Sequence, residues 1–326
     1  RGHFIPMNIL VLGKDGQLGK AFYVLLDSLL LALADKPNIR YIGRSECDLA
    51  DATALESLLN QLQPKLIINA SAYTAVDKAE TDTNLAFAIN AKAPEIMAHY
   101  AADHEATLVH YSTDYVFDGE KYGHYLEDDI RNPLGVYGKS KAAGEEAIAR
   151  IFASNAGSGQ YAIFRTSWVY GDGSNFIRTI LRLAKDRNEL KIIDDQYGVP
   201  TSAAWLAQVS LNLVADEKLN IKEFPSGIYH AVPAGETTWH GLATLAVQTA
   251  LEVGLPLKAV LCAIRPIPAV EYPLPAPRPM NSRMSTDKLG QVFSTWGDMS
   301  KLEQLNQPWD QAVRSYVNYL AKDGPI

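Results

Sequence analysis

Short apolar runs and amphipathic stretches alternate along the first half of the chain. The runs have the length of buried strands, and the stretches between them repeat their apolar positions with a helical period. We expect strands at residues 8–12, 40–42, 66–69, 107–111 and 161–165, and helices after the glycine-rich turn at 13–19 and at 52–62, 85–102 and 139–152. This alternation predicts an α/β fold with a doubly wound parallel sheet, because crossover helices cover both faces of such a sheet.

The alternation ends near Trp168, and the second half of the chain has a different pattern. We expect helices at 175–185, 203–214 and 309–322 and a late strand at 227–232. Residues 265–279 contain six prolines, so this segment is predicted to be an extended loop rather than a helix or a central strand. The second half therefore predicts a smaller lobe interwoven with the first.

A glycine pattern, GxxGxxG, lies between the first strand and the first helix, at Gly13, Gly16 and Gly19. The first glycine permits a tight turn, the second lets the backbone approach a pyrophosphate, and the third lets the helix pack closely on the sheet. The N–H groups of the helix N-terminus then face the phosphates. The alternative is an ordinary strand–helix turn, which the repeated βα pattern makes the weaker interpretation.

These features predict a Rossmann-type NAD(P)-binding domain over residues 7–167, with later returns near 195–232. Residues 168–326 are predicted to form mainly a substrate-binding lobe and the C-terminal helix. Residues 1–6 precede a methionine and are expected to be a remnant of cloning, outside the fold.

The end of the second predicted strand carries Gly43 and Arg44 where an NAD site usually has an acidic residue for the ribose 2′-hydroxyl. Arg44 could pair with a 2′-phosphate. We therefore expect a preference for NADPH, or tolerance of both NADPH and NADH. The alternative is that Arg44 is a solvated surface charge.

Tyr137 and Lys141 are four residues apart and share one face of a predicted helix. A nearby ammonium favours the phenolate, so we expect Lys141 to lower the pKa of Tyr137. Ser112 and Thr113 follow the fourth predicted strand, at the sheet edge where ligands bind in doubly wound folds. The alternatives are a surface helix pair and hydroxyls that merely cap a strand.

Charge and cysteine content narrow the function classes. The formal net charge is −7, which argues against a nucleic-acid partner while permitting one phosphorylated small molecule in a local pocket. Two cysteines without a CxxC pair indicate a reducing, cytoplasmic location. The most apolar stretch, 21–34, contains Asp27 and is expected to be a buried helix, so no membrane partner is predicted.

The glycine turn, the hydroxyls after the fourth strand and the Tyr–Lys pair resemble the short-chain dehydrogenase/reductase superfamily, of the extended, nucleotide-sugar-modifying type. Seven further segments, spread in order over nearly the whole chain, resemble the dTDP-4-dehydrorhamnose reductase family. They are NASAYTAVDKAE (69–80), STDYVFDG (112–119), NPLGVYGKSKAAGE (132–145), FRTSWVYG (164–171), DQYGVPTS (195–202), TTWH (237–240) and RPMNSRM (278–284).

The resemblance implies reduction of the C4 ketone of dTDP-4-dehydro-L-rhamnose to dTDP-L-rhamnose, a precursor of bacterial cell-surface polysaccharide. It implies that Tyr137 donates the proton, that Lys141 tunes Tyr137 and holds the nicotinamide ribose, and that Thr113 bonds the reacting oxygen. The implied cofactor contacts are Gly13, Gly16, Gln17, Leu18, Gly19, Gly43, Arg44, Asp48, Leu49, Ala70, Ser71, Ala72, Tyr73, Tyr137 and Lys141. The implied substrate contacts are Val76, Thr113, Asp114, Tyr115, Trp168, Arg278 and Asn281.

The resemblance also implies magnesium and a homodimer. Glu189, Asp194 and Asp195 are acidic, but their spacing predicts no metal site, and solvated surface charge is the favoured interpretation. Two other functions stay open: a nucleotide-sugar epimerase or dehydratase on the same scaffold, and a non-catalytic regulatory subunit of the methionine adenosyltransferase type. Asp114-Tyr115 supplies only half of the acid and base that a dehydratase needs, and a pure binder has no need of Thr113, Tyr137 and Lys141 together.

Overall fold

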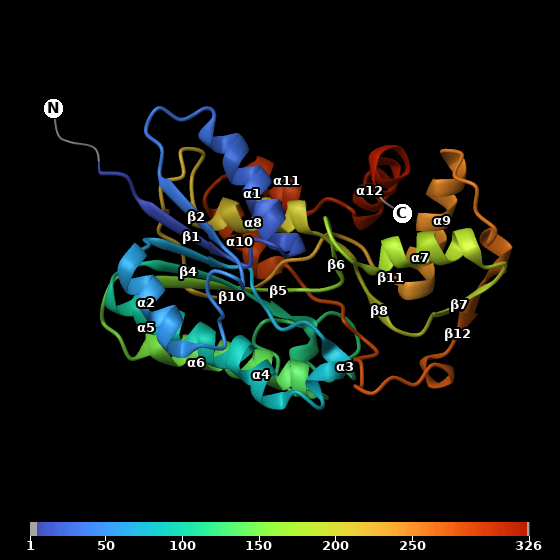
Figure 1. The fold of residues 1–326 in the computed structure, drawn as a ribbon, viewed down its shortest axis with the longest axis horizontal. Helices are drawn as coiled ribbons and strands as arrows, with labels where there is room; N and C mark the ends of the chain where they lie inside the picture. The colour runs from blue at the N-terminus through green and yellow to red at the C-terminus, as the bar shows by residue number, and fades with distance from the viewer. Residues whose placement is uncertain (1–4, 325) are drawn as a thin grey trace.

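The computed structural model describes residues 5–324 and 326, so most of the expected cloning remnant, residues 1–4, lies outside the described part (Figure 1). A parallel sheet of six strands forms its centre, in the order β10-β5-β4-β3-β1-β2. The strands are β1 (Asn8–Leu12), β2 (Asn38–Ile42), β3 (Leu66–Asn69), β4 (Thr107–Thr113), β5 (Gln160–Thr166) and β10 (Gly227–His230). The predicted α/β doubly wound sheet is confirmed.

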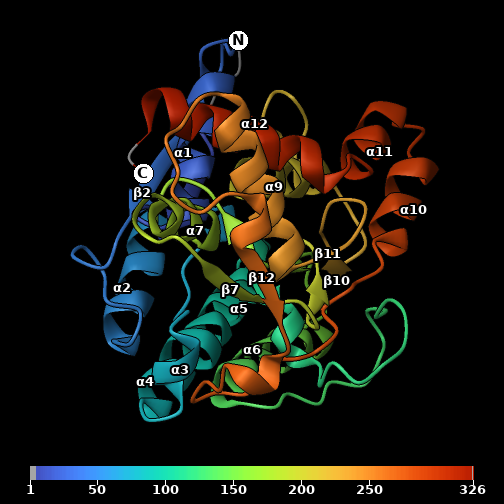
Figure 2. The ribbon, with the colours of Figure 1, turned by 90° about the vertical axis from the view of Figure 1, so that its right-hand side faces the viewer.

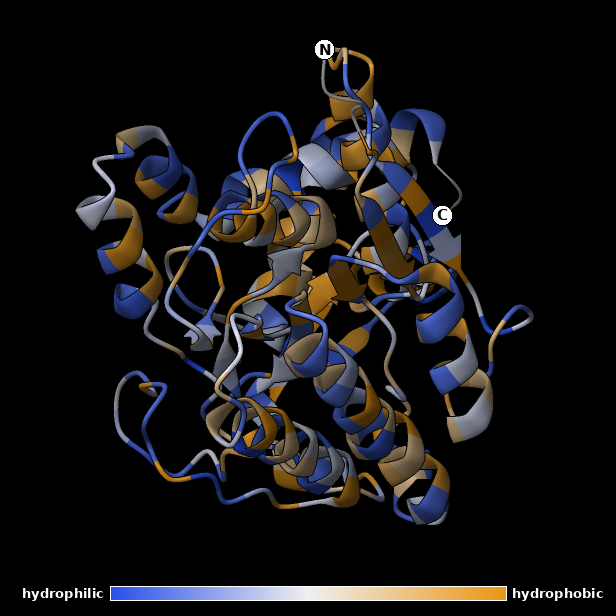
Figure 3. Ribbon diagram, turned by 90° about the vertical axis from the view of Figure 1, so that its left-hand side faces the viewer, coloured by the Kyte–Doolittle hydropathy of each residue, from blue (hydrophilic) through white to orange (hydrophobic). Residues whose placement is uncertain are grey.

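Helices cover both faces of this sheet. α1 (Gln17–Leu30) and α8 (Ala203–Val214) pack on one face, and α2 (Ala52–Leu62), α5 (Ala93–Asp103) and α6 (Val136–Ala153) pack on the other. Successive strand residues point to opposite faces, so Val11 and Val109 join the first core while Leu10 and Leu108 join the second. Figure 3 shows the apolar strands enclosed by helices of mixed polarity.

The predicted helix at 85–102 is interrupted by a wider turn. The structure has α4 (Thr83–Phe87), a π-helical turn (Ala88–Lys92) and then α5. The buried Asn90 lies in that turn, and its amide bonds both the N–H and the carbonyl of Tyr73. A π turn of this kind often marks a functional site.

The second lobe contains α7 (Phe176–Asp186), α9 (Trp239–Glu252) and α12 (Trp309–Asp323), which pack together at one end of the sheet (Figure 2). Three two-stranded ladders accompany them: β6 (Val169–Tyr170) with β9 (Thr201–Ser202), β7 (Leu190–Ile193) with β12 (Ile264–Ile267), and β8 (Tyr197–Gly198) with β11 (Thr237–Thr238). The proline-rich segment lies outside the central sheet as expected. Its start nevertheless forms β12, because a strand of a small ladder tolerates proline.

Three short helices were not predicted from the sequence: α3 (Val76–Ala79), α10 (Asp287–Thr295) and α11 (Met299–Leu305). Leu289, Phe293 and Leu305 from the last two join the core of the sheet face covered by α1 and α8. The chain thus returns to the sheet between α9 and α12 of the second lobe, and the boundary at residue 167 stays a prediction. Over the described residues, every helix is too short or too polar to span a membrane.

Candidate active site

The glycine turn joins β1 to α1 through very close backbone contacts. Gly13 has φ +86°, a conformation that side chains with a Cβ rarely adopt. A Cβ on Gly19 would lie 1.9 Å from the carbonyl oxygen of Gly13. These two positions therefore require glycine, and the turn brings the start of α1 against the end of β1.

The N-terminus of α1 is open to a ligand. Gly16 is the N-cap residue and makes no side-chain capping bond, so the first N–H groups of the helix, at Gln17 and Leu18, are available to phosphate oxygens. The side chain of Gln17 points elsewhere: its Oε1 accepts from the N–H of Gly171 at 2.9 Å. A cradle that a Cβ would fill, next to an uncapped helix, fits the pyrophosphate of a dinucleotide.

The end of β2 holds a carboxylate that the sequence interpretation missed. Glu46 accepts from the N–H of Gly43 at 3.1 Å and forms an ion pair with Lys14. The expectation that no carboxylate lies at the end of β2 is therefore wrong. The turn after the strand brings the side chain of Glu46 back to the N–H of Gly43, three residues earlier. Arg44 is exposed, and no ion pair with it is found among the described residues. Asp48 and Leu49 follow, with Asp48 accepting from the N–H of Ala50 at 3.0 Å.

The loop after β3 lies against the glycine turn. A Cβ on Gly13 would lie within 2.8 Å of Ala70 and Ser71, so this loop and the turn touch directly. Asn90 holds the next part of the loop through its two bonds to the backbone of Tyr73. Ala72 lies between these anchored positions and is exposed. Asn90 is a residue that sequence reasoning missed, and its only signal was a polar residue at a buried helical position.

The carboxyl end of β4 carries buried hydroxyl and carboxyl groups. The Oγ1 of Thr113 donates to Asp114 Oδ1 at 3.1 Å and accepts from the N–H of Tyr115 at 3.1 Å. Asp114 is 2% exposed, and burial raises its pKa to about 6. Ser112 differs from Thr113: its hydroxyl donates to Glu145 rather than facing the site.

Tyr137 lies at the start of α6, with its ring in a T-shaped contact 5.3 Å from that of Tyr115. Burial raises the pKa of Tyr137 to about 12, the charge of Asp114 adds to this, and the Thr113 hydroxyl acts in the opposite direction. The pKa of Tyr137 is raised overall because desolvation of the phenol dominates, and the expected lowering by Lys141 stays a prediction. The phenol is therefore neutral and holds a proton to donate.

Lys141 lies one turn further along α6 and is 2% exposed. Its Nζ donates to the carbonyl oxygen of Tyr111 at 2.6 Å. Burial lowers its pKa to about 8, and the charge of Glu145 acts in the opposite direction. The structure thus brings Thr113, Tyr137 and Lys141 together where β4 ends beside α6.

The expected substrate side has an aromatic wall. Trp168 has φ +48°, a strained conformation for a non-glycine residue, and stacks on Trp239 with ring centroids 3.8 Å apart. Trp239 begins α9, and its Nε1 donates to Gln196 at 3.2 Å. Val76 begins α3 and is half-buried.

Arg278 and Asn281 are largely engaged within the protein. Both terminal nitrogens of Arg278 bond to the carboxylate of Asp77, and Nη1 also donates to the carbonyl of Ala276. The amide nitrogen of Asn281 donates to the carbonyls of Lys121 and Gly123 at 2.8 Å. A nucleotide would reach Asn281 only if these bonds broke, so its assignment as a contact stays a prediction.

Glu189, Asp194 and Asp195 each bond a different partner within the protein. Glu189 pairs with Arg265, Asp194 accepts from Thr238, and Asp195 accepts from the N–H of Ala269. No group of three or more potential ligands occurs in the described part of the chain. These residues therefore do not fit a magnesium site.

The chain is similar to a known protein family, to curated proteins and to solved structures. A family model described as RmlD substrate binding domain matches residues 7–319. A dTDP-4-dehydrorhamnose reductase of Escherichia coli strain K12 is 42% identical, over 88% of this chain and 92% of that protein. The crystal structure of a dTDP-4-dehydrorhamnose reductase from Clostridium acetobutylicum has a TM-score of 0.80 and 32% identity, over 96% of this chain and 99% of that one. A Bacillus anthracis structure named for the same enzyme, in complex with NADP, has a TM-score of 0.78 and 28% identity over the same shares.

Proposed function

The chain belongs to the RmlD substrate binding domain family, and from this premise we propose that it reduces the C4 ketone of dTDP-4-dehydro-L-rhamnose to dTDP-L-rhamnose. The observation that carries the proposal is the grouping of Thr113, Tyr137 and Lys141 at the end of β4, at the same edge of the parallel sheet as the glycine turn after β1. Its curated relatives bear the name of this reductase and support an oxidoreductase over an epimerase, a dehydratase or a regulatory subunit.

Reduction of a ketone adds a hydride to the carbonyl carbon and a proton to its oxygen. A bound reduced nicotinamide supplies the hydride. Tyr137 would transfer its phenolic proton to the oxygen, for which its raised pKa keeps it ready. The hydroxyl of Thr113 would donate to the same oxygen and orient it. Lys141 would place its ammonium beside the phenolate that remains and stabilise that charge.

The cofactor contacts are proposed on the fit of the turn and the loops beside it. Gly13, Gly16 and the N–H groups of Gln17 and Leu18 would hold the pyrophosphate, while Gly19 keeps the helix close. Gly43, Asp48 and Leu49 would surround the adenosine, and Ala70, Ser71, Ala72 and Tyr73 would line the nicotinamide channel. Val76, Asp114, Tyr115, Trp168, Arg278 and Asn281 would enclose the sugar nucleotide.

The choice between NADPH and NADH depends on charges at the end of β2. Arg44 is exposed and could pair with a 2′-phosphate, whereas Glu46 could accept from a 2′-hydroxyl or repel a phosphate. Lys14 neutralises Glu46 in part through its ion pair. We therefore propose that NADPH is preferred and NADH tolerated.

This preference is tested by kcat/KM with each cofactor. Arg44→Ala should lower kcat/KM for NADPH about tenfold, a loss of about 1.4 kcal/mol, and leave NADH nearly unchanged. Glu46→Gln is the matched variant, and it should favour NADPH further. A strong NADH preference of the wild-type protein would overturn the assignment.

The decisive experiment measures oxidation of NADPH in the presence of the dTDP-4-keto sugar, made in situ by a dehydratase and an epimerase. One NADPH should be consumed per sugar, and dTDP-L-rhamnose should be formed. Absence of turnover, combined with oxidised cofactor tightly bound to the purified protein, would instead support an epimerase or dehydratase. We further propose that the enzyme is a homodimer, which light scattering tests through its molar mass. We also propose that it acts in the cytoplasm and that its product is used for cell-surface polysaccharide.

A further inference from the structure

A completely buried carboxylate lies on the same face of α6 as the two proposed active groups. Glu145 comes one turn after Lys141 and two turns after Tyr137, and it has 0% exposure. Its oxygens accept from Ser112 Oγ at 2.5 Å, from Arg165 Nη2 at 2.6 Å and Nε at 3.0 Å, and from Arg131 at 3.3 Å. Three segments therefore meet on one side chain.

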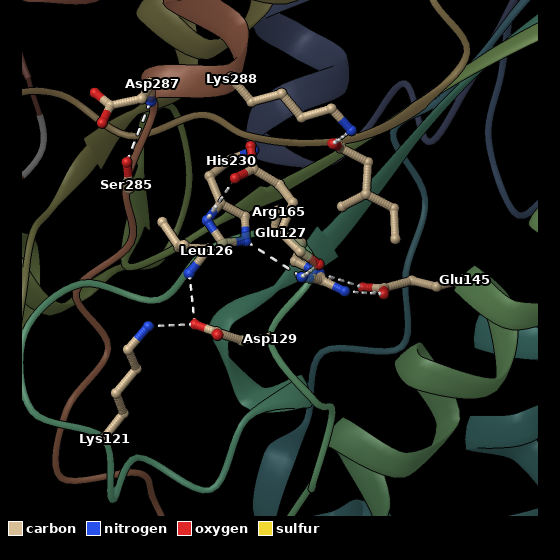
Figure 4. Close-up of polar contacts among 11 residues, drawn as sticks. Lys121, Leu126, Glu127, Asp129, Glu145, Arg165, His230, Ser285, Asp287 and Lys288 are labelled. Carbon is tan, nitrogen blue, oxygen red and sulfur yellow. Dashed lines mark hydrogen bonds and ion pairs between the residues drawn. The ribbon is translucent and has the colours of Figure 1, made fainter.

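Arg165 compensates this charge from β5. It is 1% exposed and forms a two-point pair with Glu145, as Figure 4 shows. Its remaining nitrogen, Nη1, donates to the carbonyl of Glu127 and lies 3.2 Å from His230 Nε2. All three guanidinium nitrogens of Arg165 are therefore bonded, and the guanidinium also lies over the ring of Phe117. A buried ion pair persists at low cost only when it is fully bonded in this way.

The pair acts on a short piece of backbone that matters for the chemistry. Lys141 Nζ bonds the carbonyl of Tyr111, and Glu145 bonds the hydroxyl of Ser112. The next residue is Thr113, the proposed partner of the reacting oxygen. Two consecutive residues of β4 are therefore clamped to α6 directly before the active hydroxyl, from adjacent turns of one helix.

We propose that Glu145, held by Arg165, is a positioning residue for the reduction described above: it fixes the end of β4 against α6 and supplies the negative charge opposite the Lys141 ammonium. The inference rests on the proposed function.

The charges around Lys141 support this assignment. On its own helix, α6, Glu145 and the neutral Tyr137 are near. On β4, His110 is held neutral because burial, and then the charge of Lys141, lower its pKa well below the usual value. On β5, the charge of Arg165 is paired with Glu145. Burial lowers the pKa of Lys141 to about 8, and Glu145 is the group that opposes this.

The test is the pH profile of kcat for Glu145→Gln, which keeps the shape of the side chain and removes its charge. Lys141 is active when protonated, so activity is present below its pKa and lost above it. Without the carboxylate, this alkaline limit should move to lower pH by about one unit, which means about a fivefold loss of kcat at the wild-type limit and about a tenfold loss well above it. The KM for the sugar should stay within about twofold.

Glu145→Asp is the companion variant, because it keeps the charge but shortens the reach. Its alkaline limit should stay at the wild-type pH, while kcat falls about tenfold because Ser112 or Arg165 loses its bond. Arg131→Gln is the matched control: it removes a charge beside Glu145 at a half-buried position, and it should not move the limit to lower pH. Circular dichroism verifies folding of each variant.

Three results overturn the inference: an unshifted limit in Glu145→Gln, an equal downward shift in Arg131→Gln, or wild-type kcat in a folded Glu145→Asp. If Glu145→Gln does not fold because Arg165 is left unpaired, the Asp variant alone decides the positioning role. Wild-type turnover tests the proposed function separately. Should the wild type not turn over, the same pH limits are measured from NADPH affinity, and a shift there supports the inference while the proposed function fails.

Discussion

The buried carboxyl of Asp114 should make the protein less stable as the pH rises. Asp114 is 2% exposed, Oδ1 accepts from Thr113, and Oδ2 has no partner among the described residues. Burial raises its pKa from 3.8 to about 6. An unfolded chain releases this proton near 3.8, whereas the folded chain keeps it to about 6. Stability is therefore full below the unfolded pKa and falls as the pH rises between these values.

The size of the loss follows from the shift. A change of about 2 pKa units at about 1.4 kcal/mol each gives about 3 kcal/mol, complete above about pH 7 and below about 1 kcal/mol at about pH 4. A side-chain amide cannot ionise, so Asp114→Asn should remove this dependence. The fixed effect of an amide in place of the acid is the same at both pH values and cancels in their difference.

Urea unfolding of wild type and Asp114→Asn, at about pH 4 and about pH 7.5, measures the effect. The free energy of unfolding of the variant, relative to wild type, should rise by about 2–3 kcal/mol from the lower to the higher pH. Asp118→Asn is the control of opposite sign, because a bond from the N–H of Glu120 holds the pKa of Asp118 below its usual range. A relative stability of Asp114→Asn that is equal at both pH values would refute the reasoning.

Three further predictions concern the turn, the proton donor and a buried histidine. Tyr137→Phe should lower kcat about 10²–10⁴-fold, about 3–5 kcal/mol in barrier, and leave NADPH affinity within about twofold, whereas Tyr122→Phe on the exposed loop should behave as wild type. Activity above about a tenth of wild type in Tyr137→Phe would contradict the assigned role. Gly19→Ala places a Cβ 1.9 Å from Gly13 O and must displace the turn, so NADPH affinity should fall at least about tenfold; Gly123→Ala, where the Cβ meets nothing within 4 Å but φ is +78°, controls for strain alone, and equal affinities would contradict the cradle. Burial lowers the pKa of His230 from 6.5 to about 3, so the unfolded chain binds a proton first and stability is lost as the pH falls below 6.5. In urea unfolding, His230→Gln should reduce that slope by up to about 1.4 kcal/mol per pH unit between about pH 6 and 4, and an unchanged slope would show that the histidine titrates normally when folded.

Much of the fold follows from local pattern. The bounds predicted for β1, α2, β3 and α8 agree with the structure, because each is an apolar or amphipathic segment with glycine, proline or a capping side chain near one end. The turn at Gly13 is equally local, since its φ of +86° is a conformation that glycine adopts without strain. The Tyr137–Lys141 face depends only on helical spacing.

The missed features involve partners that are distant in the sequence. Arg278 bonds Asp77 across 201 positions, and Glu145 bonds Ser112 across 33. The docking of α10 and α11 on the sheet also escaped prediction, because short helices with few apolar residues look like loops until a partner surface is present.

The sequence by itself determined the alternating layers, the glycine turn and the identity of the proposed proton donor. These depend on residue type and on spacings of a few positions, which one-dimensional patterns record. Only the tertiary structure decided that Glu46 reaches the end of β2, that Ser112 serves Glu145 rather than the site, and that Tyr137 has a raised pKa. Each of these depends on burial and on which charges meet across the fold, and desolvation is a property of packing that no local pattern contains.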